Sequence, residues 1–383
     1  MDFRFSEAEE RFKQDVANFF TEDKELVEAA RKEWDSGEGY GPNCWEILKK
    51  IGAKGWLTPT WPKEYGGLGL SYMYRYIIQE QMHHFLNIYS TVGAGMAGPV
   101  ILNQGSEEQK RFFLPKIAGG EIEFVLGYSE PEAGSDLASL TIEVKEEEDH
   151  FVINGQKMFN TRAHYAQYHW LGARTKETTP KYKGISLFIV DISTPGITLT
   201  PYYTVGGERT NGVFYDNVRV PREALVGEMN RGFYYIIEAL AYERISTVAG
   251  LERDLQELLI WVRKTDRGKD PLVRQKIAES AIDIEAARLL ALKVASMLDE
   301  GTIPSHEASM LKILVSEGEQ KLLNTAMQVM GPYGQLQKGS KWVQMNGEIE
   351  RGYRDSLQEL IVRGTSEIMR NIIAERGLKL PRS

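Results

Sequence analysis

Two short segments hold residue types that could bind a cofactor or a substrate. The first, residues 128–136, reads YSEPEAGSD. Gly134 lets a ligand approach the backbone closely, and the hydroxyls of Ser129 and Ser135 can donate to oxygen atoms. The second, residues 364–367, opens a predicted helix with a Gly-Thr step whose backbone N–H groups suit a phosphate. Composition alone favours plainer interpretations, a polar turn for the first segment and a helix N-cap for the second.

Other familiar motifs carry little weight. Residues 93–98 match G-x-G-x-x-G, but the region before them is helical and no βαβ unit follows. Close helix packing, or room for a ligand chain, is therefore the better interpretation. His83 and His84 are adjacent and would point to different sides of a helix, which argues against a metal site. The sequence holds no G-x-S-x-G motif, and its six histidines offer no obvious nucleophile–base pair.

The composition excludes several classes of protein. The 383 residues are 42% hydrophobic and 26% charged, which is ordinary globular usage and excludes a disordered, collagen-like or coiled-coil chain. A net charge of −8 without any basic block argues against a nucleic-acid partner. Cys44 is the single cysteine, so neither an intramolecular disulfide nor a cysteine-held metal is expected. Because no signal-peptide pattern and no 18-residue apolar run is present, we expect a cytoplasmic protein without a membrane span.

The elements that must position these segments fall into three blocks, which predict an α+β fold. Residues 1–122 have helical periodicity and begin with a capping box at Ser6 and Glu9. Residues 123–228 hold short alternating runs, with Asn154-Gly155 as a candidate tight turn, and predict an antiparallel β-sandwich or barrel. Residues 229–383 return to helical periodicity and predict a C-terminal four-helix bundle.

Taken in order along the chain, these segments resemble the signatures of the acyl-CoA dehydrogenase family. Residues 129–136 are similar to its T-E-P-x-A-G-S-D motif, and residues 154–161 to its N-G-x-K-x-W-I-T motif. Residues 328–334 are similar to Q-x-x-G-G-x-G, and residues 354–355 and 364–368 to the C-terminal signature. One match alone is weak, but the ordered set covers most of the chain and is specific. The three-block layout is also that of the family.

The resemblance implies that FAD binds between the β domain and the C-terminal helices. Ser129 would hydrogen-bond the edge of the flavin ring, Thr161 would reach its N5 region, and Phe159 would replace the Trp that usually packs on it. Gln328 would contact the FAD of a neighbouring subunit, which implies a dimer or a homotetramer built as a dimer of dimers, although Pro332 replaces a motif glycine. The cofactor-binding positions carried over in this way are Leu126, Tyr128, Ser129, Gly134, Ser135, Phe159, Thr161, Gln328, Gly331, Thr365 and Glu367.

The catalytic base departs from the commonest family pattern. The family removes a proton from Cα of an acyl-CoA with a carboxylate, which in many members directly precedes the Gly-Thr step. Arg363 stands there in this chain, and a guanidinium cannot act as a general base. Isovaleryl-CoA and long-chain members carry the carboxylate on an earlier helix, just before an Arg. Glu243 and Arg244 match that pattern, so the resemblance makes Glu243 the base.

The resemblance also implies a substrate site. Arg244 would pair with the phosphates of CoA, Ser135 would lie along the CoA arm, and Met96 and Tyr242 would shape the acyl pocket. The backbone N–H of Arg363 would polarise the thioester carbonyl oxygen, together with a ribityl hydroxyl of the cofactor. The guanidinium of Arg363 could pair with a protein acid, face solvent, or meet a carboxylate on a dicarboxylic substrate.

Several functions stay open at this point. The leading one is an FAD-dependent acyl-CoA dehydrogenase that passes electrons to an electron-transfer flavoprotein. The alternatives are altered acyl-CoA chemistry on the same fold, an acyl-CoA oxidase, and a catalytically silent subunit of a hetero-oligomer. For Glu243 and Arg244 themselves, the plainer interpretation is an ordinary charged pair at a helix surface. The sequence does not identify the acyl group.

Overall fold

A computed structural model describes residues 3–88, 91–243 and 248–381. Its first block is helical, as expected. The predicted capping box at the start of the first helix is confirmed, because Glu9 N donates to Ser6 Oγ at 3.3 Å and Ser6 N donates to the Glu9 carboxylate at 2.7 Å. The α-helices of this block are α1 (Glu7–Glu22), α2 (Lys24–Glu33), α3 (Pro42–Ala53), α4 (Tyr72–Leu86), α5 (Gly98–Gln104) and α6 (Glu107–Ala118).

The G-x-G-x-x-G residues serve close packing, as the sequence favoured. Gly93–Ala97 form a buried π-helical turn directly before α5. A Cβ atom on Gly98 would lie 2.2 Å from the ring of Trp61, so only glycine fits at this contact. A strand would have to precede these residues in a dinucleotide-binding site, and a helix-rich segment stands there instead.

The central block is one seven-stranded sheet in the order β1-β4-β2-β3-β7-β6, with β5 also paired to β4. Four pairings are antiparallel (β2–β3, β3–β7, β4–β5 and β6–β7), and β4 runs parallel to both β1 and β2. The strands are β1 (Phe124–Gly127), β2 (Glu143–Glu146), β3 (His150–Lys157), β4 (Tyr168–Arg174), β5 (Ile185–Asp191), β6 (Ile197–Tyr203) and β7 (Arg209–Pro221).

The Asn154-Gly155 pair is not the tight turn that the sequence suggested. Both residues lie inside β3, where the register against β7 shifts between Ile153 and Gly155. The extra residue of this β-bulge is on β7, because Ile153 pairs with Val218 and Gly155 with Tyr215, so β7 advances three residues while β3 advances two. Gly155 itself has φ +136°. The chain reverses earlier instead, where Glu147 N donates to the carbonyl of His150 at 2.9 Å.

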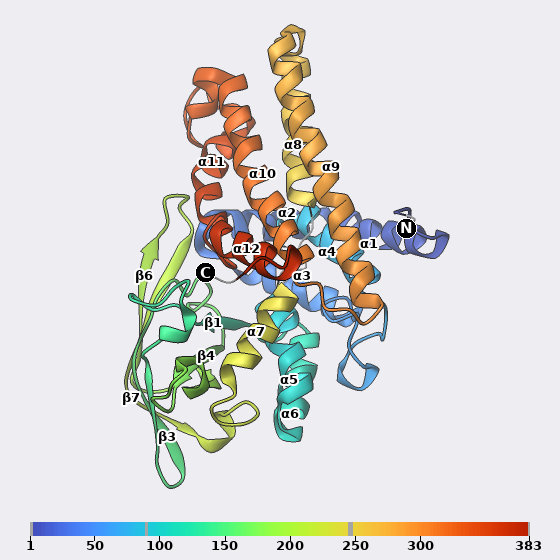
Figure 1. The fold of residues 1–383 in the computed structure, drawn as a ribbon. Coiled ribbons are helices and arrows are strands. Elements are labelled where there is room, and N and C mark those ends of the chain that lie inside the picture. Colours follow the sequence, from blue (N-terminus) through green and yellow to red (C-terminus); the bar gives the residue numbers. More distant parts are fainter. Residues whose placement is uncertain (1–2, 89–90, 244–247, 382–383) are drawn as a thin grey trace.

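The third block is helical and contains the expected bundle. Helices α8, α9, α10 and α11 pack along one another, and Figure 1 shows them together at one end of the molecule with the sheet at the other. The helices are α7 (Gly232–Glu243), α8 (Ala249–Lys264), α9 (Pro271–Asp299), α10 (His306–Met330), α11 (Glu348–Glu359) and α12 (Ser366–Ile372). The predicted α+β fold is therefore confirmed. No helix within the described ranges is long and apolar enough to cross a membrane.

Candidate functional site

The end of β1 and the turn after β3 are held together by backbone contacts. Met158 N donates to Ser129 O at 2.9 Å, and the side-chain amide of Asn160 donates to Leu126 O at 2.9 Å. Asn160 N in turn donates to the carbonyl of Asn211 on β7 at 2.9 Å. Two segments about 30 residues apart in sequence, both singled out from their motifs, thus form one unit of structure.

A buried ion pair, which the sequence did not reveal, anchors the same unit. The Lys157 ammonium donates to Glu130 Oε1 at 2.8 Å and to Tyr128 O at 3.0 Å, and its side chain is fully buried. The Glu130 carboxylate also accepts from the backbone N–H groups of Thr141 at 2.6 Å and Ile142 at 3.0 Å. Burial lowers the pKa of Lys157 to about 8, against the opposing effect of Glu130. The pair fixes the backbone on both sides of Ser129.

The polar and aromatic side chains of this unit fit a flavin. Phe159 has φ +59°, and 64% of its surface is exposed, which is unusual for a phenylalanine. Thr161 lies two residues on, with its hydroxyl 3.4 Å from that of Thr210. A Cβ atom at Gly134 would meet no atom within 4 Å, so the backbone there is open to a ligand. An exposed ring face beside hydroxyl groups and open backbone suits an isoalloxazine ring and its chain.

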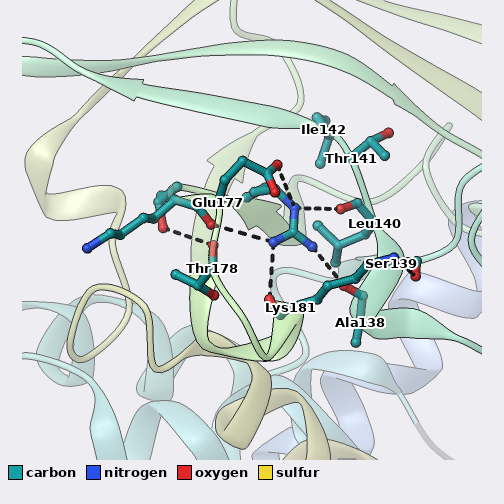
Figure 2. Close-up of polar contacts among 12 residues, drawn as sticks. Ala138, Ser139, Leu140, Thr141, Ile142, Glu177, Thr178 and Lys181 are labelled. Carbon is teal, nitrogen blue, oxygen red and sulfur yellow. Dashed lines mark hydrogen bonds and ion pairs between the residues drawn. The ribbon is translucent and has the colours of Figure 1, made fainter.

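Arg174 binds the segment that follows Ser135, at Ala138 and Leu140, both of which Figure 2 labels. The guanidinium is 7% exposed and donates to the carbonyls of Leu140 at 3.0 Å, Ala138 at 2.7 Å and Lys181 at 3.1 Å. It also lies 3.6 Å from the carboxylate of Glu177. Arg174 therefore ties the loop after Ser135 to the β4–β5 loop. No role for Arg174 was predicted from the sequence.

Glu243 is the last residue of α7 and lies within electrostatic range of Tyr128. Burial raises the pKa of the Tyr128 phenol, and the charge of Glu243 raises it further, which places this carboxylate near the residue before Ser129. Met96 is 3% exposed in the turn before α5, and Tyr242 is half-buried beside Tyr72 and Arg75 of α4. Arg244, expected to contact CoA phosphates, lies outside the described residues.

Arg363 is directed to a protein acid, one of the three possibilities that the sequence left open. Its guanidinium pairs with the carboxylate of Glu359, four residues earlier and at the end of α11. Arg363 and Gly364 both have left-handed backbone, with φ +58° and φ +90°. Thr365 is the N-cap of α12 and accepts from Ile368 N at 3.2 Å, so the plainer interpretation of the Gly-Thr step is confirmed. Glu367 is exposed in the first turn of α12.

Gln328 and Gly331 lie away from this unit. Lys276 of α9 donates to the side-chain oxygen of Gln328, and Arg267 donates to Val329 O at 3.1 Å, so this end of α10 meets the α8–α9 turn. Lys312, whose ammonium donates to Glu359 O at 2.8 Å, lies about four helical turns earlier on α10. Gln328 therefore lies about four helical turns along α10 from the residue that binds the end of α11.

Thr161 also lines a cavity of about 950 Å³. Its wall combines Trp34 after α2, Trp261 of α8 and Asp355 of α11 with the β6–β7 loop. Basic and acidic side chains line it in equal number, so its lining favours no single charge.

Three family models match the chain in succession. They are described as the acyl-CoA dehydrogenase N-terminal domain (residues 6–121), middle domain (residues 125–218) and C-terminal domain (residues 230–378). The chain is 33% identical over 409 residues to acyl-CoA dehydrogenase FadE26 of Mycobacterium tuberculosis, with 100% of both chains covered. It resembles the solved Tcur3481-Tcur3483 steroid ACAD at TM-score 0.93 and 33% identity, again over 100% of both chains. It also resembles the ChsE4-ChsE5 complex from Mycobacterium tuberculosis at TM-score 0.90 and 32% identity, over 100% of both chains.

Proposed function

Because this chain belongs to the acyl-CoA dehydrogenase family, we propose that it oxidises an acyl-CoA thioester between Cα and Cβ with Glu243 as the base. Members of this family are FAD-dependent oxidoreductases that act on CH–CH bonds. Ser129, Phe159 and Thr161, with the backbone of Gly134, would hold the flavin in this chain. Bound FAD supplies the acceptor for the hydride that leaves Cβ.

The placement of Glu243 carries this proposal. Its charge acts on Tyr128, whose carbonyl is fixed by Lys157 and whose neighbour is Ser129. A carboxylate at this point would stand beside the proposed flavin edge, where a Cα proton must be removed. Arg363 holds the position of the commoner base, but it stays charged and pairs with Glu359. Glu243 is therefore the carboxylate that we assign to proton removal.

The turn at Arg363 has a second role in the proposal. A thioester Cα proton is a weak acid, so charge that develops on the carbonyl oxygen must be stabilised. We assign this to the backbone N–H of Arg363, in a turn shaped by two successive left-handed residues. Loss of one such donor typically costs about 10²–10³ in rate. The Arg363–Glu359 pair keeps the turn attached to α11.

The test is an anaerobic absorbance titration of the purified protein with acyl-CoA thioesters. We expect at least one thioester to bleach the flavin band, and Glu243→Gln to slow bleaching by on the order of 10³-fold or more while the bound FAD is retained. Glu238→Gln is the matched control, since Glu238 lies on the same helix and accepts from Asn103 at 2.6 Å. Near-full activity of Glu243→Gln would reject Glu243 as the base. A protein that binds no flavin would support the silent-subunit alternative.

We further propose an electron-transfer flavoprotein as the acceptor of the electrons. Reoxidation of the substrate-reduced protein should be much faster with such a flavoprotein than with dissolved oxygen. The opposite order would identify an oxidase. For assembly we propose a homotetramer, although two solved relatives are named as complexes of two different chains. Light scattering on the chain expressed alone separates these arrangements.

A further inference from the structure

Arg75 is a buried guanidinium whose charge no carboxylate neutralises. It lies on α4 with 7% of its surface exposed. Within residues 3–88, 91–243 and 248–381 its side chain takes part in no hydrogen bond and no ion pair. Two carboxylates on or beside α4 are engaged elsewhere, because Glu80 pairs with Lys13 at 2.7 Å and Asp299 accepts from the backbone N–H of Tyr72 at 2.5 Å.

A buried charge without a partner is costly, so its presence calls for a compensating group. Burial lowers the pKa of Arg75, but a guanidinium still keeps its proton near neutral pH. The surroundings of Arg75 therefore suit an anion that is not part of the described chain.

A second unsatisfied group lies one helical turn away. Gln79 is 6% exposed, and within the described part of the chain its side-chain oxygen has no hydrogen-bond partner. Arg75 and Gln79 line one small cavity of about 10 Å³, with Trp56, Met82 and Ala94 on its wall. This volume is near that needed for one water molecule. The cavity therefore has room for about one water molecule or one carboxylate oxygen, and Arg75 and Gln79 line it together with apolar side chains.

The turn that carries Ala94, on the cavity wall, packs against α7, which ends at Glu243. Arg75 acts electrostatically on Tyr72 and Tyr242, and Tyr242 directly precedes Glu243. Ala94, on the cavity wall, shares a π-helical turn with Met96. An acyl group whose Cα lies at Glu243 and whose chain passes Tyr242 would bring its far end toward Arg75.

We propose that Arg75 binds a carboxylate at the far end of the acyl group, so that the site takes a dicarboxylic acyl-CoA. This inference rests on the proposed function and names its substrate class. The planar guanidinium can hold a carboxylate through two parallel N–H···O bonds. Arg75, and not Arg363, then carries the recognition of a second carboxylate, since the Arg363 guanidinium pairs with Glu359.

The experiment compares pairs of CoA thioesters that have the same chain length and end in either a carboxylate or a methyl group. Dissociation constants come from the perturbation of the flavin spectrum, and bleaching rates are measured on the same samples. We expect wild-type protein to bind the carboxylate-ended thioester about 10- to 100-fold more tightly, the range of a charge-assisted hydrogen bond. Arg75→Met should reverse this preference. Arg288→Met, which removes a surface guanidinium paired with Glu285 at 2.7 Å, should leave it unchanged.

Equal affinity of wild-type protein for the two ends, or an affinity ratio that Arg75→Met does not change, would overturn the inference. If Arg75→Met does not fold, Arg75→Lys serves, since it keeps the charge but loses the paired bonds and should lower the ratio. A carboxylate-ended thioester that binds through Arg75 without bleaching the flavin would support this inference and reject the proposed oxidation. Bleaching by methyl-ended thioesters alone would support the proposed oxidation and reject the inference that Arg75 binds a carboxylate.

Discussion

The fully buried Lys157–Glu130 pair decides how well the proposed flavin contacts are placed. Lys157→Met would leave the Glu130 carboxylate buried without its cation, which typically costs about 3–5 kcal/mol. We therefore expect a large loss in the free energy of unfolding in urea, together with less FAD per chain. The double variant Lys157→Met, Glu130→Gln removes both charges, and should recover at least half of the lost stability. A double variant as unstable as the single one would contradict this account.

His169 makes stability depend on pH. It is fully buried on β4, bonded to the Tyr215 hydroxyl, and burial lowers its pKa from 6.5 to about 3. The unfolded chain then binds a proton between these two values that the folded chain does not bind. The contribution of neutral His169 to the free energy of unfolding is fully present above pH 6.5. It is lost as the pH falls toward 3, by about 1.4 kcal/mol per pH unit.

The measurement is urea unfolding at several values between pH 6 and pH 4. His169→Gln should have a lower free energy of unfolding than wild type at neutral pH. As the pH falls, its free energy of unfolding should decrease less steeply than that of wild type, and the two slopes should differ by about 1.4 kcal/mol per pH unit. His306→Gln, at a half-buried position at the start of α10, is the control and should keep the wild-type slope. Parallel curves for His169→Gln and wild type would show that His169 does not titrate on unfolding.

At the scale of elements, Arg174 joins two loops that no strand pairing holds. Arg174→Lys keeps the charge but loses the guanidinium hydrogen bonds to the carbonyls of Leu140, Ala138 and Lys181 (Figure 2). We expect faster amide hydrogen exchange in residues 136–142 and 176–184, unchanged exchange in β3 and β7, and weaker binding of CoA thioesters. Arg222→Lys is the matched control, because this Arg donates to two carbonyls and to Glu146 in a different loop. Exchange that rises throughout the sheet would show a general loss of stability instead.

Sequence patterns predicted those structural features that depend only on residues close together in the chain. The capping box at Ser6 was visible in the sequence, because it depends on residues only three positions apart. The bulge of β7 opposite Gly155 was not, since it depends on how β3 meets β7. The partner of Lys157 lies 27 residues earlier, and spacing along the chain does not reveal such a pair. The one available signal was the inward-facing position of Lys157, in step with Phe151 and Ile153.

At the scale of the whole molecule, the proposed site depends on all three blocks. Met96 comes from the first, Ser129 and Phe159 from the second, and Glu243 from the third. Family motifs named these residues, whereas Arg75 belongs to no motif and emerged only from its burial. A buried charge is a property of the packed molecule, so it could not be predicted from the order of residues.

Assembly provides the corresponding test at this scale. If Gln328 contacts the FAD of a neighbouring subunit, Gln328→Ala should lower the FAD retained per chain after gel filtration without changing the midpoint of unfolding in urea. Gln275→Ala, on the exposed face of α9, should change neither quantity. Full FAD retention by Gln328→Ala would remove the support that this residue gives to an intersubunit site.

The pairing of Arg363 with Glu359 also constrains how this enzyme could evolve. A mutation of Arg363 to Glu would place a carboxylate at the commoner base position, but beside Glu359, where like charges repel. That substitution becomes tolerable only after Glu359 has changed. Loss of Glu359 alone would remove the ion-pair partner of the Arg363 guanidinium. The two positions are therefore epistatic, and a lineage with the proposed base on α7 is held there by a pair of side chains that takes no part in the proposed proton removal.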